Sequence, residues 1–409
     1  MSSIPGATKP GVLDGVRIVD MTSVVMGPLA TQLLGDFGAD VIKVESPDGD
    51  TTRRVGPMRS PRMGWIYLHL NRNKRSLVLD LKKASARDAL ARLVETSDVV
   101  VASVRPAALA RLGITYAALA RVNPKLIWVS LVGFGDGPYA GKPVYEDLVQ
   151  GLTAVPSLLV SAGSEEPHYV PVSFNDRMVG VHAAMSITMA LLHRERTGQG
   201  QQIEIPMFET MAQHVLGDHF GGRTFEPPLG PPGYLRTLNK QRRPYRTADG
   251  HVCVIVYTDA HWKNFLGLVG KADLMETDPR LRDIGSRTEH SDALYGLVSE
   301  QMAQRSTEDW LARLAAADIP AAPLHTLDSV FDDPHLLATG TLASAEHASE
   351  GAIREIRPAG QWSVSPPAIR RRAPRLGQDS AAVLRDAGLS QAEIQALVDE
   401  GATLVAQAA

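Results

Sequence analysis

Hydrophobic and polar positions alternate in two rhythms over the first 130 residues of the chain. Short apolar, β-branched runs, which predict strands, lie at 16–21, 41–45, 76–81, 98–104 and 126–132. Segments with helical spacing lie between them, at 29–38, 84–95 and 107–112. Strands that alternate with helices form parallel sheets with right-handed crossovers. We therefore predict an α/β fold with a Rossmann-like parallel sheet covered on both faces.

The longest apolar stretch follows Asn175 and predicts a long helix. Large apolar side chains recur along it at helical spacing, at Met178, Val181, Met185, Met189 and Leu192. Because further apolar residues fill the adjacent face, we expect this helix to be buried around most of its circumference. The pattern puts Asp176 at the N-cap, where the helix N-terminus would lower its pKa and keep it ionised. Asp176 could then be a helix cap only, or an aimed nucleophile or base.

The elements predicted beyond residue 200 are shorter. They are a strand at 202–206, a hairpin over 245–257, and helices at 207–216, near 260–270, 290–304 and 307–317, and at 380–387 and 390–400. The last helix begins with a capping box of Ser390 and Glu393. A stretch rich in Pro and Gly at 225–234 is typical of a linker.

With 409 residues the chain is long for one core, so we expect two domains. We predict a large, Rossmann-like domain over 1–225, completed by 335–409. A small α+β domain with its linkers is predicted over 226–334.

Composition excludes several classes of partner. A net charge of −3 gives no reason to expect nucleic acid or an anionic membrane surface. No run approaches the ~18–20 apolar residues of a membrane span. The first residues lack a signal-peptide pattern, so we expect a cytoplasmic protein without a membrane partner. The single cysteine, Cys253, excludes an intrachain disulfide and a Cys-rich zinc site, and we expect no metal.

A Rossmann-like sheet raises the question of a nucleotide cofactor. Glu45 ends the second predicted strand, where dinucleotide-binding folds place an acid for the ribose. The first strand–helix turn is SVVMGP, however, and lacks the G-x-G-x-x-G fingerprint. No G-x-x-x-x-G-K-[ST] loop occurs either. We therefore do not expect NAD or FAD.

Seven segments carry a further signal that covers almost the whole chain. They include GPLATQLLGDFGADVIKVESPDGDTTR at 27–53 and GFGDGPYAGKPVYEDLVQGLTAV at 133–155, and the others lie at 70–82, 104–119, 190–209, 245–250 and 373–394. Together they resemble the class III CoA-transferases of the CaiB/BaiF type, which include formyl-CoA transferase and carnitine CoA-transferase. The resemblance implies an interlocked-dimer CoA-transferase fold, in which each chain of a homodimer threads through the other. It also implies that the large domain, 1–225 completed by 335–409, is a CoA-binding domain, with coenzyme A as substrate and no tightly bound cofactor.

The resemblance assigns roles to individual residues. Asp176 in FNDRMVG matches the family's nucleophile, which moves CoA from an acyl-CoA to a carboxylic acid through mixed-anhydride and aspartyl-CoA thioester intermediates. Glu146 matches a second active-site carboxylate, although it could instead begin a surface helix. The implied contacts to CoA are Val25, Met26, Leu79, Asp80, Leu81, Lys82, Ser103, Val104, Arg105, Arg111 and Tyr145.

The chain also departs from formyl-CoA transferase. Val25 and Met26 stand where that enzyme has a polar Gln and a small residue, and LNKQRRPY at 238–245 replaces a glycine-rich loop. Specificity for formate or oxalate therefore does not follow. A basic turn could hold the 3′-phosphate of CoA or be solvated; its charged residues are Arg72, Lys74 and Arg75.

Two other interpretations stay open. An α-methylacyl-CoA racemase exchanges a proton with paired His and Asp bases, and its His would fall at Glu146. A non-catalytic acyl-CoA-binding protein would not need both Glu146 and Asp176.

Overall fold

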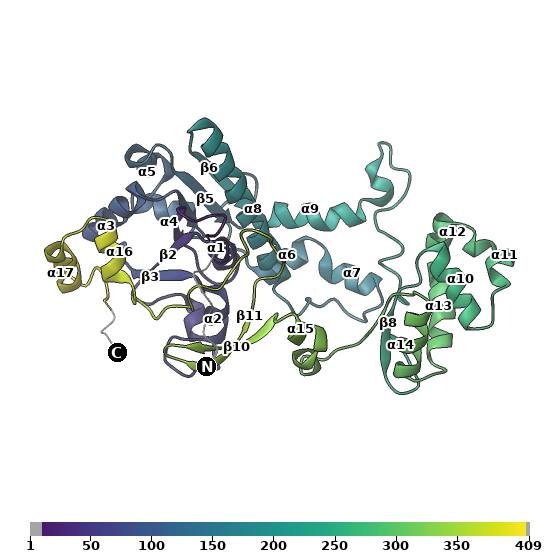
Figure 1. The fold of residues 1–409 in the computed structure, drawn as a ribbon. Helices are drawn as coiled ribbons and strands as arrows, with labels where there is room; N and C mark the ends of the chain where they lie inside the picture. Colours follow the sequence, from purple (N-terminus) through teal and green to yellow (C-terminus); the bar gives the residue numbers. More distant parts are fainter. Residues whose placement is uncertain (1–9, 406–409) are drawn as a thin grey trace. The chain divides into compact units, whose positions relative to one another are not determined.

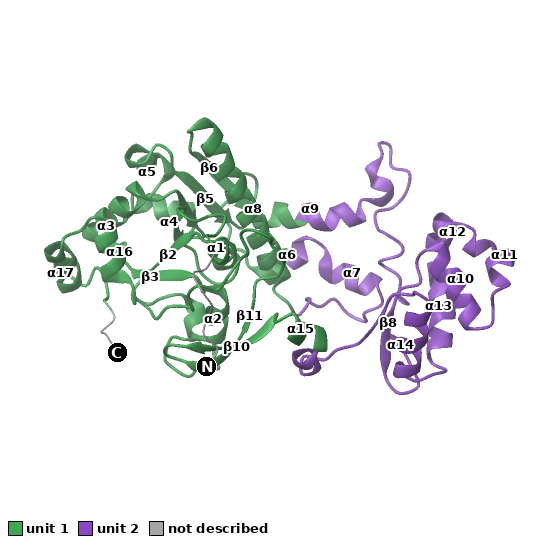
Figure 2. Cartoon of the chain, in the orientation of Figure 1, with its two compact units in different colours: residues 1–149, 172–211, 334–409 green, residues 150–171, 212–333 purple. Residues whose placement is uncertain are grey.

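The structure is a computed structural model that describes residues 10–405 (Figure 1). These residues divide into two compact units (Figure 2). Unit 1 comprises 10–149, 172–211 and 334–405, and unit 2 comprises 150–171 and 212–333. Most of the N-terminal segment in which we expect no signal peptide lies outside the described residues.

The units and the predicted domains divide the chain differently. Residues 150–171 and 212–225 belong to unit 2, whereas we placed them in the large domain. Both segments contain helical residues, from α7 (Val155–Ser161) and from the end of α9 (Met207–His219). Apolar periodicity identifies such helices but does not say with which unit they pack. The predicted boundary therefore followed the next stretch rich in Pro and Gly.

Unit 1 is built around a six-stranded sheet whose strands are all parallel. Their order is β3-β2-β1-β4-β5-β6, the order of dinucleotide-binding Rossmann domains. The strands are β1 (Arg17–Met21), β2 (Asp40–Glu45), β3 (Lys74–Val78), β4 (Val99–Ala102), β5 (Ile127–Val132) and β6 (Gln201–Pro206). The predicted parallel sheet is confirmed. Its order reverses between β1 and β4, and such sheets bind ligands at the carboxyl ends of the strands at this point.

The third strand begins earlier than predicted. β3 starts at Lys74, whereas the apolar pattern begins at Ser76. Lys74 is fully buried, and its ammonium group lies 2.9 Å from the carboxylate of Asp20 on β1. A lysine fits a buried strand only when a partner is present, and this partner is distant in the sequence.

Hydrophobic clusters cover both faces of the sheet. One includes Val19 and Val100 and is closed by α3 (Ala84–Glu95), α4 (Pro106–Arg111), α5 (Tyr116–Val122), α16 (Ser380–Asp386) and α17 (Gln391–Asp399). The other includes Ile18 and Val101 and is closed mainly by α1 (Met26–Asp36) and α8 (Phe174–Thr197). Successive strand residues point to opposite faces, so the sheet is the middle of three layers.

The C-terminal segment covers the edge of the sheet at β3. The Asp379 carboxylate accepts a hydrogen bond from the Ser76 N–H at 2.9 Å, and the Asp379 N–H donates to the Ser76 carbonyl at 3.0 Å. Ser380 Oγ accepts from the Val78 N–H, and Thr403 Oγ1 donates to the Val78 carbonyl. Backbone groups that an edge strand would leave open are thereby paired.

Unit 1 also contains α2 (Trp65–Leu70), the first turn of α6 (Glu146–Leu152), α15 (Pro334–Ala338), the 3-10 turn η1 (Thr51–Arg54), and an antiparallel hairpin of β10 (Leu342–His347) and β11 (Gly351–Ile356). Among the described helices of either unit, none combines the length and apolar character needed to cross a membrane.

Unit 2 has its own core and a small sheet. The antiparallel strands β7 (Tyr245–Arg246), β8 (His251–Val254) and β9 (Ala321–Pro323) lie in this order. The predicted hairpin is confirmed, whereas β9 falls in a Pro-rich passage where we predicted no strand. Trp262, Phe265 and Trp310 are buried in the core. Its other elements are α10 (Asp259–Leu268), α11 (Leu274–Thr277), α12 (Ile284–Glu289), α13 (Ser291–Met302), α14 (Thr307–Ala316), η2 (Gly221–Thr224), η3 (Pro279–Leu281) and η4 (Ser329–Asp332).

Candidate active site

The first turn of α8 holds Asp176. The helix begins at Phe174, and Ser173 occupies the N-cap position without a side-chain hydrogen bond. Asp176 is the third helical residue, so the prediction that it caps the helix was wrong. Because α8 ends at Thr197, just before β6 begins at Gln201, its first turn points toward the carboxyl edge of the sheet (Figure 1).

Glu146 supplies the cap that Asp176 does not. Its carboxylate accepts hydrogen bonds from the backbone N–H of Asp176 at 2.9 Å and of Asn175 at 3.3 Å. The Asn175 side-chain amide donates in turn to the Glu146 carbonyl at 3.1 Å. A negative charge therefore lies at the positive end of the α8 dipole. Glu146 is also the first residue of α6, so it both begins a helix and lies beside Asp176.

The pKa of Asp176 moves in the direction opposite to our prediction. The carboxyl group of Asp176 is partly buried. This burial and the negative charge of Glu146 raise its pKa to about 6, and the charge of Arg177 offsets only part of this shift. Asp176 is therefore ionised at pH 7 but takes up a proton slightly below it. Poorly solvated carboxylates with raised pKa values are typical of reactive sites.

The buried side of α8 combines small residues with larger apolar ones. The small ones are Gly180, Ala183, Ala184 and Ala190, and the larger ones are Val179, Ile187 and Leu191. A Cβ at Gly180 would lie 2.7 Å from the carbonyl oxygen of Met26, the first residue of α1. The absence of a side chain therefore lets the start of α1 approach α8 one turn after Asp176.

The opposite side of α8 is exposed in the single chain, so the prediction of a helix buried on nearly all sides was wrong. Its large apolar residues are each 40% to 60% exposed; they are Met178, Val181, Met185, Met189 and Leu192, which we call the α8 stripe. Periodicity alone could not tell which apolar side packs on the sheet. Small residues on the buried side allow α1 to approach closely at Gly180.

Most residues implied to contact CoA follow the carboxyl ends of strands. They are Val25 and Met26 after β1, Leu79, Asp80, Leu81 and Lys82 after β3, and Ser103, Val104 and Arg105 after β4. The Ser103 hydroxyl accepts a hydrogen bond from the Ser23 N–H at 3.2 Å, which joins two of these loops. Arg111 ends α4, and Tyr145, which is exposed, precedes α6. The loops after β1 and β4 thus meet where the strand order reverses.

The side chains of this set differ in accessibility. The exposed ones include Lys82, Val104, Arg105 and Arg111. Val25 and Leu79 are buried in hydrophobic clusters, so only their backbone could contact a ligand. The exposed lysine and arginines are the members suited to bind phosphate groups.

The basic turn near the start of β3 is paired within unit 1. Arg72 lies 2.7 Å from the carboxylate of Asp36, and Arg75 lies 2.7 Å from that of Asp40. The ammonium group of Lys74 is fully buried. These pairs do not favour the interpretation that the turn binds the 3′-phosphate.

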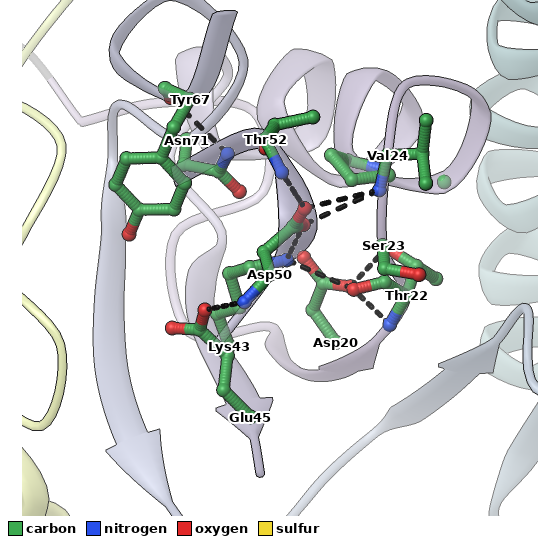
Figure 3. A network of polar contacts seen from close by, with 12 residues as sticks. Asp20, Thr22, Ser23, Val24, Lys43, Glu45, Asp50, Thr52, Tyr67 and Asn71 are labelled. Carbon is green, nitrogen blue, oxygen red and sulfur yellow. Dashed lines mark hydrogen bonds and ion pairs between the residues drawn. The ribbon is translucent and has the colours of Figure 1, made fainter. Parts of the chain in front are cut away.

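A group of buried charges lies beneath the loop that follows β1 (Figure 3). This buried charge cluster consists of Asp20, Lys43, Glu45, Asp50, Arg53 and Lys74, each at most 4% exposed. The two carboxylate oxygens of Glu45 bond to Arg53 at 2.8 and 2.7 Å, so Glu45 is not free to bind a ribose. Our sequence analysis missed the cluster because its partners come from different strands. Within residues 10–405, no group of three or more His, Cys, Asp or Glu side chains could hold a metal ion.

A profile of the family described as CoA-transferase family III matches residues 13–380. The chain belongs to this family. The resemblance carried by the seven sequence segments is thereby confirmed, and this family III protein is an enzyme.

Relatives of this family III chain extend over nearly its whole length. It is 31% identical to the succinate–glutarate CoA-transferase of Agrobacterium fabrum, over 94% of this chain and 98% of the relative. It is 30% identical to a formyl-CoA:oxalate CoA-transferase of Rhodopseudomonas palustris, over 96% and 97%. Among solved structures, Rv3272 from Mycobacterium tuberculosis aligns with a TM-score of 0.77 at 27% identity, over 92% and 99% of the two chains. A CaiB/BaiF family protein from Brucella suis gives a TM-score of 0.77 at 29% identity, over 93% and 100%.

Proposed function

We propose that this enzyme transfers CoA from an acyl-CoA thioester to a carboxylic acid through a covalent intermediate on Asp176. One observation carries the proposal: a half-exposed carboxylate lies in the first turn of α8, beside Glu146, toward the carboxyl edge of a Rossmann-like sheet. Membership in CoA-transferase family III and the names of the relatives support the transfer of CoA between acids.

The proposed chemistry conserves the energy of the thioester. An Asp176 oxygen attacks the thioester carbonyl carbon, the C–S bond breaks, and CoA leaves as a thiolate from a mixed anhydride. The thiolate then attacks the aspartyl carbonyl, which releases the original acid as a carboxylate and leaves an aspartyl-CoA thioester. An incoming carboxylate reverses the two steps, leaves as its CoA ester and regenerates Asp176.

Glu146 contributes to this chemistry in two ways. Its hydrogen bonds to the first N–H groups of α8 hold the turn that carries Asp176. Its charge also opposes the ionised form of Asp176. Both the anhydride and the thioester remove the charge of Asp176, so acylation relieves this repulsion. The carboxylate pair therefore favours formation of the covalent intermediate.

CoA is proposed to bind along the loops after β1, β3 and β4. The exposed side chains of Lys82, Arg105 and Arg111 would hold its phosphates, and the backbone of Val25 and Met26 would lie near its thioester end. The named relatives act on different acids, so we propose carboxylic acids as the class of acceptor rather than one compound.

A trapping experiment tests the proposal. Incubation of the wild-type protein with an acyl-CoA and no acceptor should leave CoA attached to Asp176. Hydroxylamine should release the CoA and leave an aspartyl hydroxamate at residue 176, detected by peptide mass. The matched control is Asp147→Ala, which removes an exposed carboxylate next to Glu146 and should still form the adduct. An unmodified Asp176, or an adduct at another residue, would contradict the proposal.

The same incubation in heavy water tests the racemase interpretation. A racemase would exchange the α-proton of a 2-methylacyl-CoA for deuterium and form no CoA adduct. We expect the adduct without rapid exchange, because Glu146 and Asp176 are two carboxylates with no histidine in the pair. A non-catalytic binding protein would give neither product.

We also propose the interlocked homodimer that the resemblance implies. The α8 stripe supports it, because five large apolar side chains in one exposed row are typical of an interface. Light scattering after size exclusion should give twice the mass of the chain. The double variant Met185→Lys with Met189→Lys should reduce this species, whereas Val122→Lys, at an exposed valine outside the stripe, should not. A monomeric wild type would contradict the proposal.

A further inference from the structure

Val24 has a backbone conformation that its side chain opposes. Its φ is 71°, in the left-handed region that β-branched residues rarely adopt. Val24 lies in the loop between β1 and α1, directly before Val25 and Met26. Such a conformation persists only where the surroundings enforce it, and it is commonly found at ligand sites.

The buried charge cluster enforces this conformation (Figure 3). The Val24 N–H donates to both carboxylate oxygens of Asp50, at 3.3 Å each. Lys43 Nζ lies 3.0 Å from Asp50 and donates to the Thr22 carbonyl at 2.8 Å. The Thr22 N–H donates to Asp20 at 2.9 Å. Both the beginning and the middle of the loop are therefore bonded to buried charges.

Stability alone does not account for this cluster. Its three carboxylates and three cations lose most of their hydration, and the ion pairs regain little more than this loss. Apolar side chains of similar size would support the sheet as well. Asp20 and Lys43 occupy paired positions on β1 and β2, and Asp50 follows β2. The charges therefore fix the loop relative to two strands of the sheet.

The loop held in this way leads into a contact with α8 one turn after Asp176. The Met26 carbonyl at the start of α1 lies against Gly180 of α8. On its other side, the Ser23 N–H bonds to Ser103 in the loop after β4. Residues 22–26 thus connect the buried charge cluster with α8 and with the loop after β4.

We propose that Asp20, Lys43 and Asp50 are positioning residues that hold residues 22–26 in the shape that receives CoA. The inference rests on the proposed function, because it takes the end of this loop as a contact to CoA. A loop that is already ordered spares the ligand the entropy cost of ordering it. Loosening the loop should therefore weaken binding more than it slows the chemistry.

Two variants test the inference from opposite sides. Asp50→Asn keeps the side-chain size but removes the charge that holds Val24 and Lys43. Val24→Gly places a residue that adopts positive φ without strain and keeps the N–H that donates to Asp50, so the loop should hold its shape. We expect Asp50→Asn to raise the Kd for CoA, measured by calorimetry without turnover, about tenfold, as lost preorganisation predicts. Val24→Gly should bind CoA at least as tightly as the wild type. In Asp50→Asn the KM for the acyl-CoA should rise in parallel with the Kd, and kcat should stay close to the wild-type value.

Thermal unfolding separates positioning from general support of the fold. Val24→Gly should unfold at the wild-type temperature or above it, because glycine relieves the strain at positive φ. Val24→Ala keeps the strained backbone and should bind CoA like the wild type. Arg53→Met removes an equally buried charge that bonds to Glu45 and Tyr67 instead of the loop. This control should lower the unfolding temperature and leave the Kd unchanged.

Wild-type affinity in Asp50→Asn, or a tenfold loss of affinity in Val24→Gly, would overturn the inference. An equal loss of affinity in Arg53→Met would also overturn it, because the effect would then be one of general stability. A wild-type protein that binds CoA but does not transfer it would overturn the proposed function and not the inference about the loop.

Discussion

Two groups of carboxylates in unit 1 are both shielded from water but have opposite acidities. In the first turn of α8, burial and the charge of Glu146 raise the pKa of Asp176 to about 6. In the buried charge cluster, burial alone would raise the pKa of Asp20, but the charges of Lys74 and Lys43 outweigh it and lower the pKa to about 2. Burial in turn lowers the pKa of Lys74 to about 8, because Asp20 offsets only part of this effect.

The comparison shows that partners, rather than burial, decide the state of a carboxylate. The cluster gives Asp20 two ammonium groups and makes it a fixed acceptor for backbone and hydroxyl groups. The α8 turn gives Asp176 a second carboxylate and leaves its electron pairs available for attack. An ammonium group beside Asp176 would keep it ionised to lower pH but would make it a weaker nucleophile. The following predictions test this contrast, from the largest expected effect to the smallest.

Asp176→Ala should remove transfer activity by on the order of 10³-fold or more, because no other group would form the anhydride. Its free energy of unfolding at pH 7 should stay the same or rise slightly, because an ionised carboxylate with a raised pKa opposes folding at that pH. Turnover and urea unfolding measure the two effects. Asp147→Ala should keep wild-type values of both. More than a few per cent of residual turnover in Asp176→Ala would contradict the assignment.

Asp20→Asn should have the reverse signature, with a large loss of stability. It leaves Lys74 buried without its ion-pair partner, which typically costs ~3–5 kcal/mol. Urea unfolding at pH 7 measures this loss. In the wild type, the stability that Asp20 contributes is present above its unfolded pKa of 3.8 and is lost as the pH falls toward about 2. The double variant Asp20→Leu with Lys74→Met should lose less than the single variant. A single-variant loss below ~1 kcal/mol would refute this view of the cluster.

Gly180→Ala should disturb the contact that joins the two regions. The added Cβ would lie 2.7 Å from the Met26 carbonyl, so α1 and α8 must separate. Overpacking of this kind costs about 1–3 kcal/mol, and we expect a lower kcat/KM as well. Gly217→Ala in α9 is the matched control, because its Cβ would meet no atom within 4 Å. Gly217→Ala should be neutral or stabilising through helix propensity. Equal effects of the two variants would contradict the prediction.

The pH dependence of acylation should report the raised pKa of Asp176. With an acyl-CoA and no acceptor, the single-turnover rate should increase as the pH rises through about 6, where Asp176 loses its proton. Glu146→Gln retains a hydrogen-bond acceptor for α8 but removes the second negative charge. The rise of the rate with pH should therefore occur at lower pH in Glu146→Gln, while burial still keeps the pKa of Asp176 above the usual range. If the rate of Glu146→Gln rose at the same pH as that of the wild type, Glu146 would not act on the pKa of Asp176.

The fold could be predicted largely from local patterns. The helix at 84–95 has the predicted bounds, and the capping box of Ser390 and Glu393 is present. Both features depend on contacts between residues three or four positions apart, so the local sequence determines them. Parallel pairing of the strands was also predicted correctly, because it follows from the alternation of strands and helices.

The site was harder to predict because its partners are distant in the sequence. The position of Asp176 near the start of a long helix was recognised, but its pKa depends on Glu146, 30 residues earlier. Lys43 interrupts an apolar strand. The pattern could not show that its ammonium group forms an ion pair with Asp50 and donates to the Thr22 carbonyl. Which side of α8 is buried was likewise not given by periodicity, because it depends on contacts with α1, such as that of Gly180 with Met26.

The pairing of the C-terminal segment with the edge strand β3 has a consequence for the synthesis of the protein. Ser76 and Val78 are bonded to residues more than 300 positions later in the chain. During synthesis this strand is an open edge, and open edges pair with other chains and aggregate. The hazard ends only when residues 379–403 have left the ribosome and folded back. A chain that stops before Asp379 should therefore collect in the insoluble fraction instead of forming a less active enzyme.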